Sequence, residues 1–237
     1  MSKSIKKPIL IEKFYKDDNN QEIGVDEAGR GPMFGRVYAA AVILPKDDSF
    51  KHHDMKDSKK FSSVKKINQV AAYIKENAIA WAVAYIDEKE IDRINIRNAT
   101  HKAMHKAIKE VIIKQKLNYK NTHILIDGND FTPYMFFEND ILIAAQSTTI
   151  TQGDNKLTCI AAASILAKVE RDKYIIELCN QIPELDERYK LKKNKGYGTK
   201  DHMDGIKNWG ISKYHRQTFG IVKIEIKMYY LINYKLT

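Results

Sequence analysis

Runs of strand-forming residues alternate along this chain with segments of helical periodicity, and this alternation constrains the fold more than any other feature. Strand formers dominate residues 23–25, 34–44, 79–86, 124–126 and 141–145. Apolar residues recur at helical spacing within residues 62–77, 98–117 and 157–178. Helices that come between strands cover the faces of a sheet, so the pattern predicts an α/β layered fold.

The chain, at 237 residues, is long enough to bury one sizeable core without disulfides or structural metals. Residues 1–21 are polar and charged and are predicted to form a tail. We expect a main domain over residues 22–182, with residues 183–237 packed on it as a small helical extension that contains a basic, flexible run at 190–195. No stretch reaches the ~18 uncharged apolar residues of a membrane span, and the first residues lack the apolar run of a signal peptide. A cytoplasmic protein without membrane contact is therefore expected.

Charge and cysteine content narrow the classes of function. Lys and Arg number 40 against 30 Asp and Glu, which gives a net charge of +10. This surplus favours a polyanionic partner, because cations that meet phosphates release condensed counterions, but composition does not separate DNA, RNA and the ribosome. The two cysteines, Cys159 and Cys179, lack the spacing of a zinc site and are predicted to be reduced, buried thiols.

Acidic residues stand where apolar strands end and where the long helix begins. They are Asp26, Glu27, Asp127 and Asp154. Side chains at the same end of neighbouring strands converge, so we expect these four carboxylates to surround one spot, where hard divalent cations would neutralise them. Such a cluster fits a two-metal nuclease. The alternative is a surface turn in which Arg30 pairs with Asp26 or Glu27.

Other residues suit contact with nucleic acid. Gly29 and Gly31, on either side of Arg30, let the backbone approach a ligand closely and sense the 2′-hydroxyl that distinguishes RNA from DNA; a tight turn is the alternative. Lys59 lies among cations and hydroxyls, and Tyr197 stands between glycines with a ring suited to stacking, although either segment could be a solvated loop. Three further candidates, either as proton or phosphate partners or as structural residues, are His202, His215 and Arg216.

The motif at residues 26–32, Asp-Glu-Ala-Gly-Arg-Gly-Pro, resembles the signature of type 2 ribonuclease H, ribonuclease HII. Blocks similar to those of the family follow in the family's order at residues 55–62, 126–129, 153–154, 161–168, 171–172, 183–189, 195–199 and 215–219. The likeness spans about residues 22–222. The sister type, ribonuclease HIII, is disfavoured because Ala28 and Arg30 stand where its motif carries serine and lysine.

This resemblance implies a ribonuclease H-like mixed β-sheet flanked by helices, with residues 22–182 as the catalytic domain. It also implies an endonuclease that cuts the RNA strand of RNA–DNA hybrids, and cuts 5′ to ribonucleotides embedded in duplex DNA, with two Mg²⁺ or Mn²⁺ ions, leaving 3′-hydroxyl and 5′-phosphate ends. The implied catalytic and metal-binding residues are Asp26, Glu27, Asp127 and Asp154. The implied substrate-binding residues are Gly29, Arg30, Gly31, Lys59 and Tyr197. The sequence departs from the family pattern at Phe61, at Thr218 and in a longer stretch between Asp127 and Asp154.

Two other functions stay open from the residues alone. One is a nucleic-acid-binding module whose acids only balance the basic surface, and the other is a nuclease of the same fold that acts on DNA alone. Residues 223–230 have the spacing of sliding-clamp-binding peptides, with Lys223 where such peptides carry glutamine; a packed terminal strand or helix is the alternative. No motif requires an oligomer, so we expect a monomer.

Overall fold

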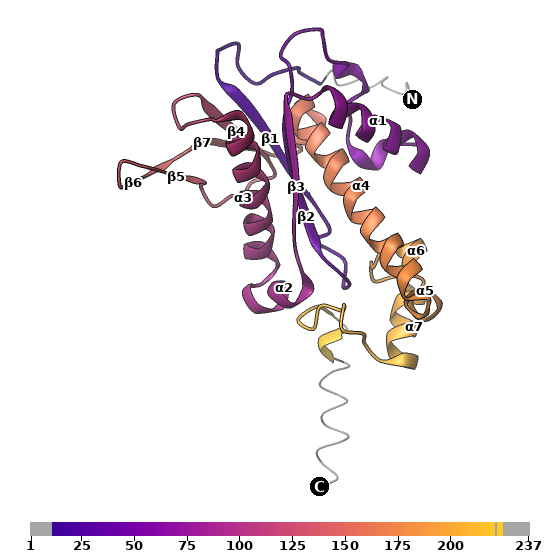
Figure 1. Cartoon of the computed structure of the whole chain (residues 1–237). Helices are drawn as coiled ribbons and strands as arrows, with labels where there is room; N and C mark the ends of the chain where they lie inside the picture. Colours follow the sequence, from indigo (N-terminus) through magenta and orange to yellow (C-terminus); the bar gives the residue numbers. More distant parts are fainter. Residues whose placement is uncertain (1–10, 221, 225–237) are drawn as a thin grey trace, which may run out of the picture.

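A mixed β-sheet forms the centre of the molecule in the computed structural model, which describes residues 11–220 and 222–224 (Figure 1). Its strands are β1 (Gln21–Ala28), β2 (Val37–Ile43), β3 (Ala80–Ile86), β4 (Thr122–Asp127) and β7 (Gln146–Ile150). They lie in the order β3-β2-β1-β4-β7. The first three strands pair antiparallel, whereas β4 is parallel to both β1 and β7. The predicted α/β layered fold with a mixed sheet is confirmed.

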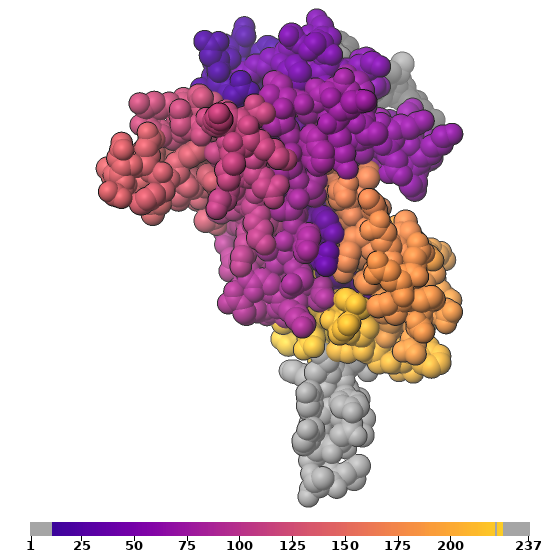
Figure 2. Space-filling view, in the orientation of Figure 1, coloured from indigo at the N-terminus to yellow at the C-terminus, as the bar shows by residue number. Residues whose placement is uncertain are grey.

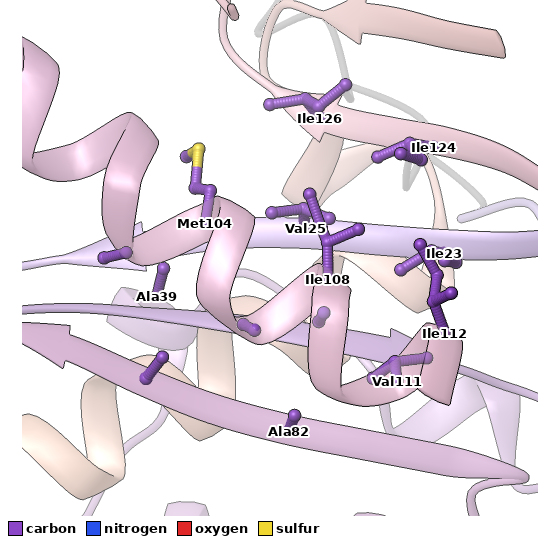
Figure 3. Packing of buried hydrophobic residues seen from close by; sticks show 14 of the residues in the cluster. Ile23, Val25, Ala39, Ala82, Met104, Ile108, Val111, Ile112, Ile124 and Ile126 are labelled. Carbon is purple, nitrogen blue, oxygen red and sulfur yellow. The ribbon is translucent and has the colours of Figure 1, made fainter. Parts of the chain in front are cut away.

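Helices cover both faces of this sheet. They are α1 (Val64–Asn77), α2 (Glu88–Ile94), α3 (Ile96–Gln115) and α4 (Thr158–Gln181). Successive side chains of a strand point to opposite faces, so Ile124 and Ile126 join the core under α3 while Leu125 joins the core under α4 and α1. Figure 3 shows the α3 side, where Ile108 lies over Val25 in the middle of the sheet.

Helix α4 comes unusually close to β1. A Cβ atom on Gly24 would lie 2.2 Å from the backbone carbon of Cys159, so only glycine permits this approach. Both cysteines are free and buried, as predicted, and burial raises the pKa of Cys159 to about 12. The close approach places the first turns of α4 directly beside the strand that ends in Asp26 and Glu27.

Three short helices pack on the C-terminal half of α4. They are α5 (Pro183–Tyr189), α6 (Leu191–Asn194) and α7 (Lys200–Trp209). Tyr189, Leu191 and Ile206 from these helices share a core with Ile175 of α4. The prediction of a flexible run at residues 190–195 is wrong, because Leu191 is fully buried and anchors α6 in this core.

The segment between Asp127 and Asp154 differs from the sequence-based expectation. Strands β5 (Met135–Glu138) and β6 (Ile141–Ala144) pair only with each other and form a hairpin that stands out from the body (Figure 2). The main sheet takes the next strand, β7, instead. This edge strand was missed because its sequence, Gln-Ser-Thr-Thr-Ile, is mostly polar.

The described ends of the chain also contact the body. Glu12 N donates to Lys156 O at 2.8 Å, and Thr158 N donates to Glu12 O at 3.0 Å. Part of the expected tail is therefore bonded to the start of α4. At the other end, residues 222–224 are helical and Val222 is buried, while residues 225–230 of the clamp-like segment lie outside the described residues. Among the described helices, none is long and apolar enough to cross a membrane.

Candidate active site

The acids at the ends of β1 and β4 lie beside each other. The two strands are parallel neighbours in which Val25 pairs with Ile126, so Asp26 and Asp127 follow at the same level. Val25 and Ile126 face α3, and because side chains alternate, Asp26 and Asp127 face α4. Asp26 is only 5% exposed. The fold therefore brings two carboxylates that are far apart in sequence to one partly enclosed position.

Negative charge is concentrated at this position. Burial raises the pKa of Asp26 well above its usual range, and the charges of Glu27 and Asp127 raise it further, against a hydrogen bond from Ser164 of α4. Burial also raises the pKa of Glu27, against the opposing effect of Arg30, whose Nη1 lies 3.6 Å from Glu27 Oε1. The Arg30–Glu27 contact foreseen as an alternative thus exists. Asp26 and Asp127, in contrast, have no ion pair among the described residues.

Asp154 joins the same neighbourhood from the start of α4. A short 3₁₀ helix, Gly153–Asn155, precedes α4, and Gly153 N donates to Asp127 Oδ1 at 2.6 Å. Burial raises the pKa of Asp154, and the charges of Asp127 and Asp57 raise it further, while Lys59 lowers it. Asp154 is therefore an electrostatic neighbour of Asp127, as expected from the sequence.

The donor chemistry of these four side chains fits a hard divalent cation, because all of them offer carboxylate oxygens. Burial and the negative charges nearby raise the pKa values of Asp26, Glu27 and Asp154, and bound cations would relieve this repulsion. Within residues 11–220 and 222–224, no three acidic, histidine or cysteine side chains are arranged to hold an ion as they stand. The fit to a metal thus rests on donor type, charge and proximity.

The turn after β1 needs glycine at one position for two reasons. Gly29 has a φ of +97°, and a Cβ there would lie 2.3 Å from Nε of Arg171 on α4. Gly31 has an ordinary φ, and a Cβ there would lie 3.5 Å from the ring of Tyr197. Arg30 between them is 54% exposed. The turn and the tyrosine predicted to read the sugar therefore lie next to each other.

Lys59 lies in the segment that precedes α1. It belongs to a 3₁₀ helix, Ser58–Lys60, and is exposed. Ser58 Oγ lies 3.1 Å from Ser164 Oγ, which ties this segment to α4. Lys59 also lies near Asp154, because its charge lowers the pKa of that carboxyl.

The remaining candidates are buried and structural. His202 and His215 are fully or almost fully buried, and their Nε2 atoms lie 3.1 Å apart. Burial lowers the pKa of His215 to about 3, so its ring is neutral. Arg216 is also fully buried and bonds to backbone carbonyls. Arg171 was given no role from the sequence beyond its place in the family-like block at residues 171–172, and because Glu170, Asp172 and Lys173 beside it are also charged, no hydrophobic pattern marks it as buried.

Comparison with known proteins decides the family. The family model for ribonuclease HII matches residues 23–222. The chain belongs to the ribonuclease HII family. It is 44% identical over 214 residues to the ribonuclease HII of Parabacteroides distasonis, covering 90% of this chain and 97% of that protein. It is 42% identical over 205 residues to that of Christiangramia forsetii, covering 86% and 93%.

Solved structures agree on the fold. The ribonuclease H2 of Pyrococcus horikoshii OT3 superposes with a TM-score of 0.62 at 21% identity, covering 88% of this chain and 98% of that one. The Bst ribonuclease HIII in complex with Mn²⁺ superposes with a TM-score of 0.63 at 18% identity, covering 89% and 70%. Members of the ribonuclease HII family are divalent-metal-dependent ribonucleases H, hydrolases that act on RNA–DNA hybrids, and this activity is assigned to the chain. The non-catalytic binding module considered from the sequence is thereby excluded.

Proposed function

We propose that this enzyme cuts 5′ to single ribonucleotides embedded in duplex DNA as well as within the RNA strand of RNA–DNA hybrids. The observation that carries the proposal is the position of the turn at residues 29–31, which lies between the carboxylates and Tyr197. A backbone turn next to an aromatic ring can test one sugar for its 2′-hydroxyl, and this test needs no run of ribonucleotides. The alternative function, a nuclease that acts on DNA alone, would have no use for this site, because DNA has no 2′-hydroxyl.

Asp26, Glu27, Asp127 and Asp154 would hold two divalent ions, Mg²⁺ or Mn²⁺. When bound, such ions supply a water of lowered pKa and stabilise the leaving 3′-oxygen, so that hydrolysis leaves 3′-hydroxyl and 5′-phosphate ends. Gly153 N fixes Asp127 through its hydrogen bond, and Ser164 of α4 lies beside Asp26. These partners hold the carboxylates in position before the substrate arrives.

The substrate contacts divide between two sides of the acids. On one side, Gly29, Arg30 and Gly31 face the ribose and Tyr197 packs on the sugar. On the other side, Lys59 meets the phosphate backbone, where its charge is exposed beside Asp154. Recognition of one 2′-hydroxyl between these contacts would set the cleavage position.

The test uses three duplexes of identical sequence: all DNA, DNA with one ribonucleotide, and an RNA–DNA hybrid. In Mg²⁺ or Mn²⁺ we expect one cut, 5′ to the single ribonucleotide, and several cuts in the hybrid, with no cleavage in EDTA. Extension of the new 3′ end by a polymerase checks for a free hydroxyl. Cleavage of the all-DNA duplex at a comparable rate, or no cleavage at the single ribonucleotide, would overturn the proposal.

We also propose that residues 223–230 contact a sliding clamp. A relative in fold from Archaeoglobus fulgidus, 22% identical with a TM-score of 0.62 and covering 84% of this chain and 95% of that one, was solved as a PCNA–ribonuclease HII complex. In this chain Val222 is buried but Ile224 is 58% exposed, so burial decreases where the segment begins. Removing residues 223–237 should leave the melting temperature unchanged and abolish binding to a purified clamp. A destabilised enzyme would instead indicate packing.

A further inference from the structure

The guanidinium of Arg216 is fully buried beneath the turn that follows β1. Its donors bond to four backbone carbonyls, those of Gly29 at 2.7 Å, Arg30 at 3.1 Å, Pro32 at 2.7 Å and Gly35 at 2.8 Å. A planar guanidinium with several fixed donors is suited to bonding several acceptors at once. Because these four carbonyls point to Arg216, the orientations of their peptide planes are fixed from within the protein.

A second set of bonds fixes the turn relative to Tyr197. Arg216 N donates to Met33 O at 2.8 Å, and Met33 N donates to Gly196 O at 2.9 Å. Arg171, which is 1% exposed, donates from Nη2 to Lys195 O at 2.8 Å, and its guanidinium lies 5.9 Å from the Tyr197 ring. Arg216 thus holds the turn, Arg171 holds the segment before Tyr197, and the backbone bond between Met33 and Gly196 joins the two.

The loop that carries Arg216 is itself held by α2. Asp92 accepts hydrogen bonds from Gln217 N at 2.8 Å, Thr218 N at 3.0 Å and Thr218 Oγ1 at 2.7 Å. Burial and the charge of Arg171 lower the pKa of Arg216, and Glu88 and Asp92 raise it. Asp92 therefore supports Arg216 in two ways, by anchoring its loop and by supplying negative charge.

We propose that Arg216 is a positioning residue for ribose recognition, and that Asp92 acts through it. Together they hold the turn at residues 29–31 at the separation from Tyr197 that a sugar with a 2′-hydroxyl requires. This inference rests on the proposed recognition of single ribonucleotides at the same site. It assigns a role in specificity to a buried arginine and to an acid on α2, neither of which touches the substrate.

The experiment measures binding selectivity, so that loss of folded protein does not imitate the effect. In the Asp127→Asn background, dissociation constants are measured for the DNA duplex with one ribonucleotide and for the all-DNA duplex of the same sequence. Selectivity is the ratio of the two constants. The variants Asp92→Ala and Arg216→Lys are added singly and together. Glu90→Ala is the matched control, because Glu90 lies on the same helix but pairs with Arg93 and Lys102.

We expect Asp92→Ala to reduce selectivity about 3- to 10-fold, the size of one lost hydrogen bond to the sugar, while affinity for all-DNA duplex stays within about twofold. Arg216→Lys should reduce selectivity at least as much, and the double variant should lose less than the product of the two single effects, because both act through one turn. Glu90→Ala should leave selectivity unchanged.

Two results would overturn the inference. One is a fall of both affinities together at unchanged selectivity, which is what general destabilisation produces. The other is a loss of selectivity in the double variant that equals the product of the two single losses, which would mean that Asp92 and Arg216 act independently. If the Asp127→Asn parent shows no selectivity at all, the proposed recognition of single ribonucleotides fails, and this inference fails with it. Should Arg216→Lys not fold, Asp92→Ala alone decides, because Asp92 is only partly buried.

Discussion

The backbone N–H of Gly153 donates to Oδ1 of Asp127 at 2.6 Å, which joins the acid at the end of β4 to the segment that carries Asp154. This bond has a structural consequence for the site. The long connection between Asp127 and Asp154 contains the projecting β5–β6 hairpin, yet both of its ends meet at the carboxylates. The projecting hairpin therefore does not separate Asp154 from Asp127.

Replacement of Gly29 by alanine should destabilise the fold. The positive φ alone costs about 1–2 kcal/mol for a residue with a Cβ, and the new methyl group would also meet the buried Arg171. Gly128→Ala is the matched control, since Gly128 has a similar φ of +100° but no atom within 4 Å of its Cβ position. Urea unfolding of both variants should show the larger loss of free energy for Gly29→Ala. Equal losses would mean that Arg171 moves aside freely.

The contribution of Asp26 to the stability of the metal-free protein should decrease as the pH rises. In the unfolded chain Asp26 loses its proton near its ordinary pKa, whereas in the fold it retains the proton to higher pH. The free energy of unfolding therefore falls between these two pKa values and stays lower above them. In EDTA at pH 7, Asp26→Asn should melt at a higher temperature than the wild type.

The same pair of proteins tests metal binding. Mg²⁺ or Mn²⁺ should raise the melting temperature of the wild type through mass action and change that of Asp26→Asn much less. An Asp26→Asn protein that melts below the wild type in EDTA at pH 7 would contradict the repulsion argued for this site. An equal response of both proteins to the metal would remove Asp26 from the ligand set.

Tyr197→Ala should reduce kcat/KM for the single-ribonucleotide duplex about 5- to 150-fold, because packing of an aromatic ring on a nucleotide contributes about 1–3 kcal/mol. Tyr197 is 48% exposed, so its loss should leave the melting temperature nearly unchanged. Trp209→Ala serves as control, since Trp209 is 62% exposed on α7 and contacts Arg188 instead. Steady-state cleavage assays compare the two; equal effects would mean that Tyr197 has no special place at the sugar.

The sequence predicted the acidic residues of the site better than the buried arginines that hold the neighbouring turn. Asp26 and Asp127 were found because each ends an apolar strand, and strand ends in a sheet converge. The sequence offered Arg216 only as a possible structural residue and Arg171 only as part of a family-like block, and it assigned neither to the turn, because a buried arginine that bonds to backbone carbonyls leaves no periodic pattern. Their partners lie up to 187 residues away in the chain, as between Arg216 and Gly29, and only the tertiary fold joins them.

Among the strands, hydrophobicity located the central ones and failed at the edge. β2 is buried along its whole length and its sequence is correspondingly apolar. β7 is polar, whereas β6 reads as a core strand, Ile-Leu-Ile-Ala, yet is largely exposed in a hairpin. A local pattern records strand preference but not which sheet a strand joins.

The central claim is that the carboxylates at the ends of β1 and β4 perform cleavage at a recognised ribonucleotide. Its most direct test compares Asp127→Asn with Asp130→Asn on the DNA duplex carrying one ribonucleotide in Mg²⁺. Asp130 lies three residues further along, is exposed and pairs with Arg97, so it controls for the loss of an acid in the same segment. We predict that Asp127→Asn abolishes cleavage while binding persists, and that Asp130→Asn cuts 5′ to the ribonucleotide at close to the wild-type rate. Cleavage by Asp127→Asn at the wild-type rate would contradict the account.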